Sequence, residues 1–394
     1  MAIRCILYAI LLIISSVFGQ SSSGWSSQLT PPTIDPQAAS LAGNVVALPL
    51  NPSSAFFHNP AQLPLLPNAL SLGLFAIRFQ PRYQSPLGYD QTSRELPIVP
   101  SVGYVTNRWA PLHVGIGIFG TLGFNFNYPA DPAHGVPNNF YTDLAILSLT
   151  PTLAYSLAPN LHIGVELNPS YGRLRFKTPS PIGRIDVDVR GPGVFGTVGL
   201  FYTPTAKLSV GIGYKTPGAI WMFGNARVAG AGDNATVNFQ LPQSVEWGVA
   251  YHFTERLTFV AQARWTELSV FEETQLKFEE RTFLNRTAVQ DARDCFRLGG
   301  GVQYILFPGV TLHVGFSWER WAIAASSLAP TLSDNTDFLF PFGVTIERGR
   351  WQVHLMGGLT HTESREVSPE QNPFFAGRYS LDESVFGVEI IRRL

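Results

Sequence analysis

One glycine-rich string and several histidines are the residues of this sequence whose types and spacing could do chemistry. Residues 115–120 read Gly-Ile-Gly-Ile-Phe-Gly and match the G-x-G-x-x-G string of nucleotide-binding turns. The match lies inside an alternating apolar segment without a strand-to-helix turn or a βαβ unit, so we interpret it as coincidental. The sequence has no G-x-S-x-G and no H-E-x-x-H string, and so gives no signal for a hydrolase or a metalloprotease. We therefore predict that the chain is not an enzyme and has no catalytic residues.

Five histidines share one setting. Each lies within a few residues of a short turn, on the less apolar face of its segment: His113, His162, His252, His313 and His354. A ring of imidazoles could bind a metal ion. The favoured interpretation is that they are neutral and hydrogen-bonded to neighbouring groups or water, so we predict no metal site and no cofactor.

Four charged residues lie on the same face as these histidines: Glu246, Arg264, Arg297 and Glu319. We expect them to pair with one another or with a segment that the strands enclose. A second interpretation is that Arg264 or Arg297 attracts the carboxylate of a bound molecule. A mature chain that has lost its leader keeps a single cysteine, Cys295, which excludes an intramolecular disulfide and has no assigned role.

The elements that carry these residues are segments in which every second side chain is apolar. In Leu112–Phe119 one face reads Leu, Val, Ile, Ile and the other His, Gly, Gly, Phe, and Leu161–Asn168, Val245–Phe253 and Leu312–Glu319 repeat the pattern. Side chains alternate across a strand, so the two sets face different media. A soluble β-sandwich also alternates, with its apolar face turned to a core.

Connections between these segments are of two lengths, in alternation. The short ones are Thr106–Pro111, Ala158–Asn160, Thr203–Ala206, Thr254–Arg256, Phe307–Gly309 and Glu347–Arg350. The long ones are about Pro81–Leu96, Asn125–Asp143, Thr178–Arg184, Gly230–Ala235, Arg281–Gln290, Ala324–Asn335 and Glu363–Gly377. Tight turns at one end and long loops at the other are typical of a bacterial outer-membrane β-barrel. The sequence predicts an all-β, antiparallel transmembrane barrel of about 14 strands, with both termini on the periplasmic side.

The first residues and the composition agree with that compartment. The apolar run from Ile6 to Val17 is too short to span a membrane, and we interpret residues 1–19 as a signal peptide. Charged residues make up 14% of the chain, well below the share in soluble domains, and the net charge of −1 gives no electrostatic case for nucleic acid. We therefore place residues 69–394 in the bacterial outer membrane, with lipid outside and a polar lumen inside.

Residues 20–68 do not alternate. They are rich in proline and small residues, yet too apolar for a disordered tail. A barrel of this size has space in its lumen, so we predict a compact hatch there. Glycines on the lumen face would let the hatch backbone approach the wall: Gly115, Gly117, Gly164, Gly211 and Gly213.

Two stretches carry a family resemblance. Leu41–Leu63 resembles the N-terminal hatch of the FadL family of outer-membrane transporters of long-chain fatty acids and hydrocarbons, which places Asn-Pro-Ala at residues 59–61. Leu241–Phe278 is similar to that family's Leu-Pro strand start and its following tryptophan-containing strand. The resemblance implies passive uptake of hydrophobic molecules past a hatch. The sequence departs from the family pattern at His58 and at its last residue, Leu394.

The resemblance also assigns candidate site residues. A pathway pocket beside the hatch would include Phe56, Phe57, Asn59, Pro60 and Ala61, with Asn59 bonding buried hatch backbone. Gly115–Phe126 resembles the family strand that is kinked to open a window in the wall, and its candidates are Gly120, Leu122, Gly123 and Phe124. The alternative is that these glycines only make room for the hatch.

The main rival function is that of an interaction protein. Some FadL-like barrels are docking shuttles of type IX protein secretion, and large loops shaped for a protein would favour that role. The loops here are moderate, about 7–19 residues, which favours a transporter. A general porin would lack the hatch. We expect a monomer whose partners are outer-membrane lipid and a hydrophobic cargo, and a protein partner only under the shuttle alternative.

Overall fold

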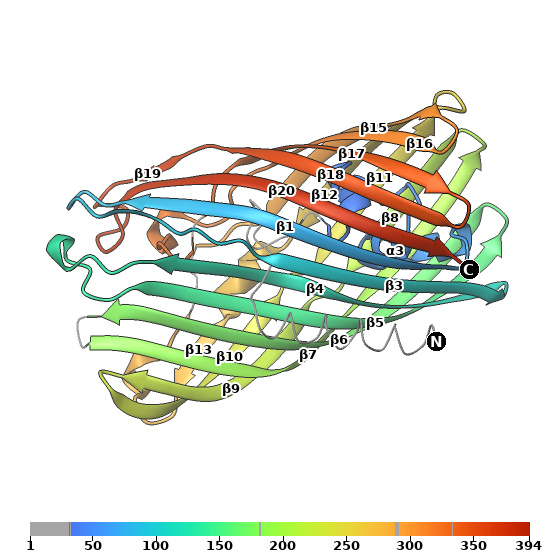
Figure 1. Ribbon diagram of the computed structural model, residues 1–394. Helices are drawn as coiled ribbons and strands as arrows, with labels where there is room; N and C mark the ends of the chain where they lie inside the picture. Colours follow the sequence, from blue (N-terminus) through green and yellow to red (C-terminus); the bar gives the residue numbers. More distant parts are fainter. Residues whose placement is uncertain (1–30, 32, 181–182, 288–290, 333) are drawn as a thin grey trace.

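Long antiparallel strands curve around a central space and close on themselves (Figure 1). The computed structural model describes residues 31, 33–180, 183–287, 291–332 and 334–394. The predicted signal peptide, residues 1–19, and the predicted hatch up to residue 30 lie outside the described residues. The first and last strands, β1 (Ala69–Gln84) and β20 (Gly377–Arg393), pair along their whole length, which closes the barrel.

Fourteen wall strands run through the described residues when a strand interrupted along its length is counted once. Between β1 and β20 they are β3 (Ile98–Trp109), β4 (Leu112–Tyr128), β5 (Phe140–Ala158), β6 (Leu161–Ser180), β7 (Gly183–Thr205), β8 (Leu208–Lys215) with β9 (Gly218–Val228), β10 (Ala231–Leu241) with β11 (Ser244–His252), β12 (Leu257–Thr266) with β13 (Gln275–Phe278), β14 (Arg286–Thr287) with β15 (Cys295–Phe307), β16 (Val310–Glu319), β17 (Asp337–Arg348) and β18 (Trp351–Thr362). Two short strands, β2 (Asp90–Thr92) and β19 (Arg365–Val367), pair with β1 and β20 near the loops. The predicted antiparallel barrel is confirmed.

Three neighbouring wall strands are interrupted at the same height. Thr216-Pro217 separates β8 from β9, and Pro242-Gln243 separates β10 from β11. These breaks face each other, since Gly218 pairs with Leu241 and Lys215 with Ser244. Proline has no N–H to donate to the ladder, which explains both breaks. The third break, between β12 and β13, contains the 3-10 helix η3 (Leu268–Glu273).

The two ends of the barrel differ as expected. The short turns lie at the end that holds the C-terminus, on the right of Figure 1, and longer connections lie at the other end. Two of the predicted long loops are shorter than expected. β6 runs to Ser180 before β7 begins at Gly183, and β9 pairs with β10 up to Val228 opposite Ala231. The sequence underestimated these strands because their outward residues are polar beyond the apolar belt.

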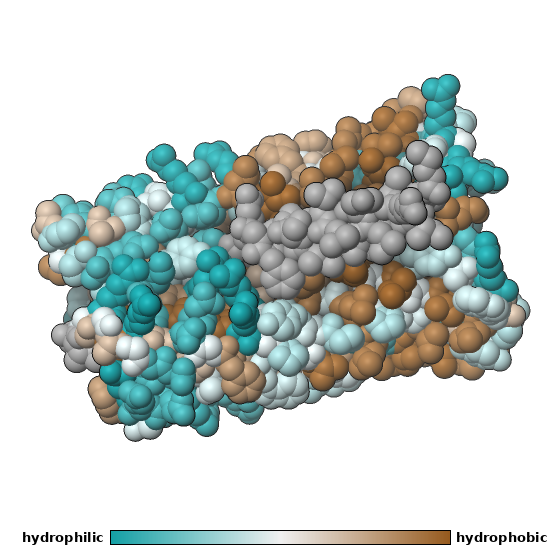
Figure 2. All heavy atoms as spheres, turned by 60° about the horizontal axis from the view of Figure 1, so that its bottom comes forward, coloured by the Kyte–Doolittle hydropathy of each residue, from teal (hydrophilic) through white to brown (hydrophobic). Residues whose placement is uncertain are grey.

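The face assignment is confirmed. Ile116, Val165, Val249 and Val314 are exposed on the outer surface, while the alternate positions of their strands are buried. Figure 2 shows apolar side chains gathered toward the short-turn end and polar side chains toward the loop end. Among the described residues, no helix is long and apolar enough to cross a membrane.

Three short helices form the hatch inside the barrel, toward the short-turn end (Figure 1). They are α2 (Pro36–Ala39), α3 (Pro52–His58) and the 3-10 helix η1 (Pro60–Leu65). Each starts with a proline after a polar residue whose side chain accepts a hydrogen bond from the first turn: Asp35 from Ala38 N, Asn51 from Ser54 N and Asn59 from Ala61 N. Nearly every hatch residue is buried, so the hatch packs directly on the wall.

Candidate functional site

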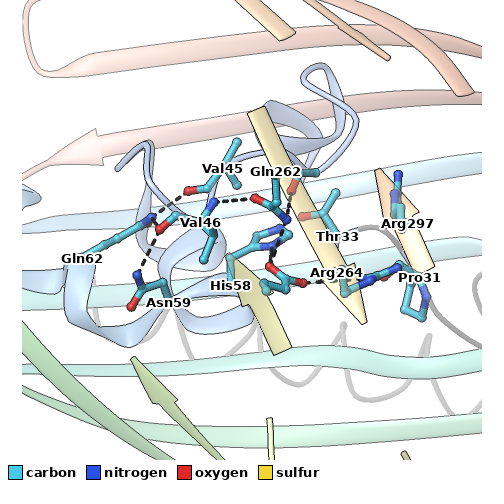
Figure 3. A network of polar contacts seen from close by, with 12 residues as sticks. Pro31, Thr33, Val45, Val46, His58, Asn59, Gln62, Gln262, Arg264 and Arg297 are labelled. Carbon is cyan, nitrogen blue, oxygen red and sulfur yellow. Dashed lines mark hydrogen bonds and ion pairs between the residues drawn. The ribbon is translucent and has the colours of Figure 1, made fainter. Parts of the chain in front are cut away.

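Asn59 joins two parts of the hatch to the wall. Its Nδ2 donates to the carbonyl of Val46 at 3.0 Å and to that of Leu200 on β7 at 3.0 Å. Its Oδ1 accepts from Ala61 N at 3.1 Å. Gln62 Nε2 also donates to the Val46 carbonyl, at 2.9 Å (Figure 3). The side chain is fully buried and its hydrogen bonds go to backbone, so it fixes the hatch and has no group turned toward a cargo.

A second set of contacts connects the hatch to β11 and β12 (Figure 3). His58 Nδ1 lies 2.8 Å from the Glu246 carboxylate. Gln262 donates to the same carboxylate at 3.2 Å and to the carbonyl of Gly43 at 3.1 Å, and accepts from Val46 N at 2.8 Å. These groups are buried or partly buried, and their hydrogen bonds offset the loss of water on burial.

The two candidate carboxylate-binding arginines both contact the hatch. Arg264 donates to the carbonyl of Pro31 at 3.0 Å and to Glu319 at 3.3 Å, and lies 3.7 Å from Glu246. Arg297 donates to the carbonyl of Ala42 at 2.8 Å and lies 3.9 Å from Glu319. Both guanidinium groups therefore have acidic partners in the wall. Attraction of a cargo carboxylate by either one stays a prediction.

Wall glycines allow the hatch backbone to touch the strands. A Cβ atom at Gly164 would overlap the backbone of Pro60 and Ala61, and one at Gly211 would overlap the Val46 carbonyl. A Cβ at Gly213 would overlap the carbonyl of His58, and Gly115 and Gly117 face the ring of Phe56. The close approach explains why side chains are missing there.

The five predicted lumen histidines do not form one cluster, and each contacts a nearby serine or threonine hydroxyl. His113 and His162 contact the hydroxyl of Ser156, at 3.2 and 3.0 Å. His313 and His354 contact that of Thr345, at 2.9 and 2.8 Å. His252 contacts Thr258 at 2.9 Å. The described residues hold no group of three or more histidine, cysteine or acidic side chains suited to a metal ion. Cys295 is free and buried, with its Sγ 3.1 Å from the carbonyl of Arg320.

A cavity of about 540 Å³ lies at the loop end of the lumen. Strands β4, β5, β6, β10 and β13 contribute to its lining, together with η3 and the loops after β16 and β19. Its aromatic residues are Phe124, Phe140, Phe176, Phe239, Phe271, Phe374 and Phe375. The polar lining residues are threonines, serines and Asn372, and no charged side chain lines the cavity among the described residues. We refer to it as the outer cavity.

A loop closes one side of the outer cavity. Residues 326–329, 331 and 332, between β16 and β17, line it. Asn372 Nδ2 donates to the carbonyls of Ala325, Ser326 and Leu328, at 3.1, 3.2 and 2.8 Å. The Asp334 carboxylate accepts from Ala322 N at 2.5 Å and from Ile323 N at 2.8 Å. Burial raises the pKa of Asp334 to about 6, although these backbone bonds favour its charged form.

A second, smaller pocket of about 50 Å³ lies between the outer cavity and the hatch. Its lining includes Phe57 of the hatch and Leu122 and Leu241 of the wall. Leu122 is two residues before Phe124 on β4, and Leu241 two residues after Phe239 on β10, so the two spaces follow each other along the same strands. We refer to it as the inner pocket.

Lys215 and Arg264 give the inner pocket its charge. Lys215 Nζ lies 3.9 Å from the ring centre of Phe57, and within the described part of the chain no ion pair is formed by its ammonium group. Lys215 was not among the site residues predicted from the sequence. Its lumen-facing position follows from alternation, because residues 209, 211, 213 and 215 form the lumen face of β8, but a single lysine at a strand end belongs to no motif that would indicate a site.

A β-bulge in β4 lies beside the inner pocket. The β4–β5 register shifts between Gly120 and Leu122, and Thr121 lines the pocket. Pairing of β3 with β4 ends at Ser101 opposite Phe119, so the edge of β4 beyond this point leaves that ladder. A bulge reverses which residues face inward. Before it the odd-numbered residues face the lumen, and after it Leu122 and Phe124 do.

The alternative that the glycines of this strand only make room for the hatch can be examined at Gly120. Among the described residues, a Cβ atom there would meet only Val99, at 3.6 Å, which is ordinary contact. Gly120 therefore does not serve hatch packing, in contrast to Gly115 and Gly117. Its role in an opening of the wall, with Leu122, Gly123 and Phe124, stays a prediction.

Comparisons with known proteins agree with this architecture. The model of the family described as outer membrane protein transport protein (OMPP1/FadL/TodX) matches residues 20–371. A Pseudomonas aeruginosa FadL homologue has a similar structure, with a TM-score of 0.82 at 14% identity over 93% of this chain and 100% of that one. The Ralstonia pickettii toluene transporter TbuX gives 0.76 at 18% identity over 92% and 99%. The Pseudomonas putida toluene transporter TodX gives 0.71 at 16% identity over 95% and 99%. A search of curated protein sequences gives no match.

Proposed function

Because the chain belongs to the family of outer membrane transport proteins described as OMPP1/FadL/TodX, we propose that its cargo is an uncharged hydrocarbon, taken up passively. The family places the chain in the bacterial outer membrane as a transport barrel and not as an enzyme. The observation that carries the finer proposal is the outer cavity, whose lining holds seven phenylalanines and no charged side chain among the described residues. Toluene transporters among the structural neighbours support the same class of cargo.

The physical reason is desolvation. A hydrocarbon gains about 25 cal/mol for each Å² of apolar surface that leaves water, and a cavity of this size can enclose a small molecule. A charged group would lose its hydration there without a counter-charge. Serine and threonine hydroxyls in the lining can donate to neighbouring carbonyls, so they tolerate an apolar neighbour.

The route proposed for the cargo runs from the outer cavity to the inner pocket and then sideways through the wall. The hatch blocks a straight path, because residues 33–63 are buried against the lumen wall except for partly buried positions near Pro49 and Leu50. The bulge at Thr121 lies beside the inner pocket, and β4 leaves its ladder with β3 at the same height. Exit at this point would pass the cargo to the membrane without crossing water.

A long-chain fatty acid is the second candidate, and Lys215 beside the inner pocket, whose ammonium group forms no ion pair among the described residues, favours it. Its alkyl chain would lie in the outer cavity and its carboxylate beside Lys215 and Arg264. The two candidates share the route and differ only in their need for the inner charge.

Uptake by a transporter-deficient host tests the proposal. Cells that express this chain should take up radiolabelled alkylbenzene faster than the empty host, and faster than cells that express Leu144→Glu, which places a charge in the outer cavity. Leu144→Met is the matched control and should transport normally. Uptake equal to that of the empty host, together with co-purification of a secreted protein, would favour the secretion-shuttle alternative.

A further inference from the structure

The outer surface of β6 changes character abruptly along the strand. Exposed apolar side chains at Ile163, Val165, Leu167 and Tyr171 are followed on the same face by Arg173, Arg175 and Lys177. The apolar part spans about 20–25 Å on a tilted strand, which matches the apolar band of a membrane barrel. Figure 2 shows the same change from apolar to polar side chains toward the loop end. The first arginine of this series therefore lies at the level of lipid headgroups.

A second arginine lies directly opposite the first. Arg173 of β6 pairs with Arg190 of β7, and both point outward. Like charges at directly opposite positions destabilise a sheet. Among the described residues, the acidic partner of this pair is Asp188, 3.4 Å from Arg173. Ion pairs of Arg190 are absent from the described part of the chain.

Two outward arginines nearer the loops have acidic partners that neutralise their charge. One outward position further from the apolar belt, Arg175 forms an ion pair with Asp143, and further still, near the loop, Arg184 contacts Asp186 at 2.6 Å. The wall thus contains enough acidic residues to pair its arginines, yet the row next to the belt keeps an excess positive charge. An anion from outside the chain would relieve the repulsion between Arg173 and Arg190.

Apolar side chains border this arginine pair. Tyr171 precedes Arg173 on β6 and is 39% exposed, and Phe223 of β9 lies opposite Arg190 and is 59% exposed. Aromatic side chains at this level mark the boundary between apolar chains and headgroups. A ligand that fits both features has an anionic group attached to acyl chains. Guanidinium groups bind phosphate through two parallel hydrogen bonds, which makes phosphate the matching anion.

We propose that Arg173 and Arg190 form a binding site for a phosphate group of the outer-leaflet glycolipid, lipid A, whose acyl chains lie on the apolar belt below Tyr171. The site is distinct from the lumen, because both side chains point outward and neither lines the outer cavity or the inner pocket. It holds the part of the wall formed by β6 and β7, next to β5, at the headgroup layer.

Native mass spectrometry of the full mature protein in neutral detergent tests the site, with diphosphoryl lipid A as the probe. Wild-type protein should bind diphosphoryl lipid A more tightly than the dephosphorylated lipid. R173Q/R190Q should bind diphosphoryl lipid A about tenfold more weakly, because two charge-assisted hydrogen bonds are lost at a solvent-accessible site. Its binding of the dephosphorylated lipid should be unchanged.

R78Q/R82Q is the matched control, since it removes two outward arginines from β1, where Arg82 is paired with Asp90. It should bind as the wild type does. Equal binding of the two lipids by wild-type protein would overturn the proposal even if R173Q/R190Q did not fold. Displacement of lipid A by an equal concentration of inorganic phosphate would also overturn it, because the site would then recognise free phosphate without the acyl chains.

Discussion

The two halves of the lumen are built from the same strands and differ in what stabilises them. In the outer half, phenylalanine, leucine and threonine line a cavity that no charged side chain enters among the described residues. In the inner half, His58 of the hatch contacts Glu246 of the wall, and Arg264 of the wall donates to the Pro31 carbonyl while it pairs with Glu246 and Glu319. Dispersion and burial shape the first half, and directional hydrogen bonds shape the second.

The two halves should therefore tolerate different substitutions. An apolar side chain in the outer half can be replaced by one of similar volume with a small loss of stability. Removal of a buried ion-pair partner in the inner half leaves its counter-charge with fewer partners, which is costly away from water. The binding of cargo is expected to depend on the outer half, and the docking of the hatch in the lumen on the inner half.

Removal of Arg264 should give the largest effect. Arg264→Leu removes the hydrogen bond to the Pro31 carbonyl of the hatch and takes one positive neighbour from each of Glu246 and Glu319. The expected loss is about 3–5 kcal/mol in the free energy of docking the hatch. Phe239→Leu in the outer half is the comparison and should cost less. Hydrogen exchange of the hatch amides measures both, and equal protection in the two variants would contradict the distinction.

Removal of the Asn59 side chain comes next. Asn59→Ala leaves the carbonyls of Val46 and Leu200 without the hydrogen bonds they receive at 3.0 Å each. The expected loss is about 1–3 kcal/mol in hatch docking, because buried acceptors are left unpaired. Heat-modified migration on gels should show an intact barrel, while uptake should change. Unchanged hatch protection would mean that Asn59 does not fix the hatch.

Replacement of Lys215 separates the two cargo classes. Lys215→Met removes the charge beside the inner pocket and keeps the length of the side chain. Fatty acid uptake should fall about tenfold if its carboxylate is bound there, and alkylbenzene uptake should not change. A parallel fall in both would show that Lys215 supports the pocket structurally.

The smallest expected effect is a pH dependence of the loop that closes the outer cavity. The pKa of Asp334 is raised by burial from 3.8 to about 6, so the closed loop favours the protonated carboxyl. Protonation of Asp334 stabilises the closed loop, and this stabilisation is lost as the pH rises from about 4 through the raised pKa of about 6. Between pH 5 and pH 7 the closed loop should lose about 1 kcal/mol. Limited proteolysis of the loop should be faster at pH 7, and Asp334→Asn should remove the difference; a loop that is cut faster at pH 5 would contradict the assignment.

Most of the barrel could be predicted because alternation and turn length are local signals. Val165 and Val249 face lipid as predicted, and the wall strands number about fourteen. The hatch was recognisable from composition and from the Asn-Pro-Ala motif at residues 59–61. Its partners were not, since the bonds from Asn59 to Val46 and Leu200 join residues distant in the chain.

The outer cavity could not be predicted for three physical reasons. Its loop residues, such as Leu328 and Phe375, carry no periodic pattern. The bulge at Thr121 reverses the inward face, so counting from Leu112 would place Phe124 toward lipid. Proline breaks such as Pro242 interrupt the strands at a point that sequence spacing does not fix. The sequence therefore indicated the glycines near the bulge, but it did not predict the cavity beside them.

The central claim is that the outer half of the lumen holds an uncharged apolar cargo. Crystals of the barrel grown with a brominated alkylbenzene would locate the ligand by the anomalous signal of bromine. The signal should lie in the outer cavity, between Phe140 and Phe239, and disappear in Leu144→Glu crystals. Bromine found only on the lipid-facing belt, in a protein that still increases alkylbenzene uptake, would contradict the account.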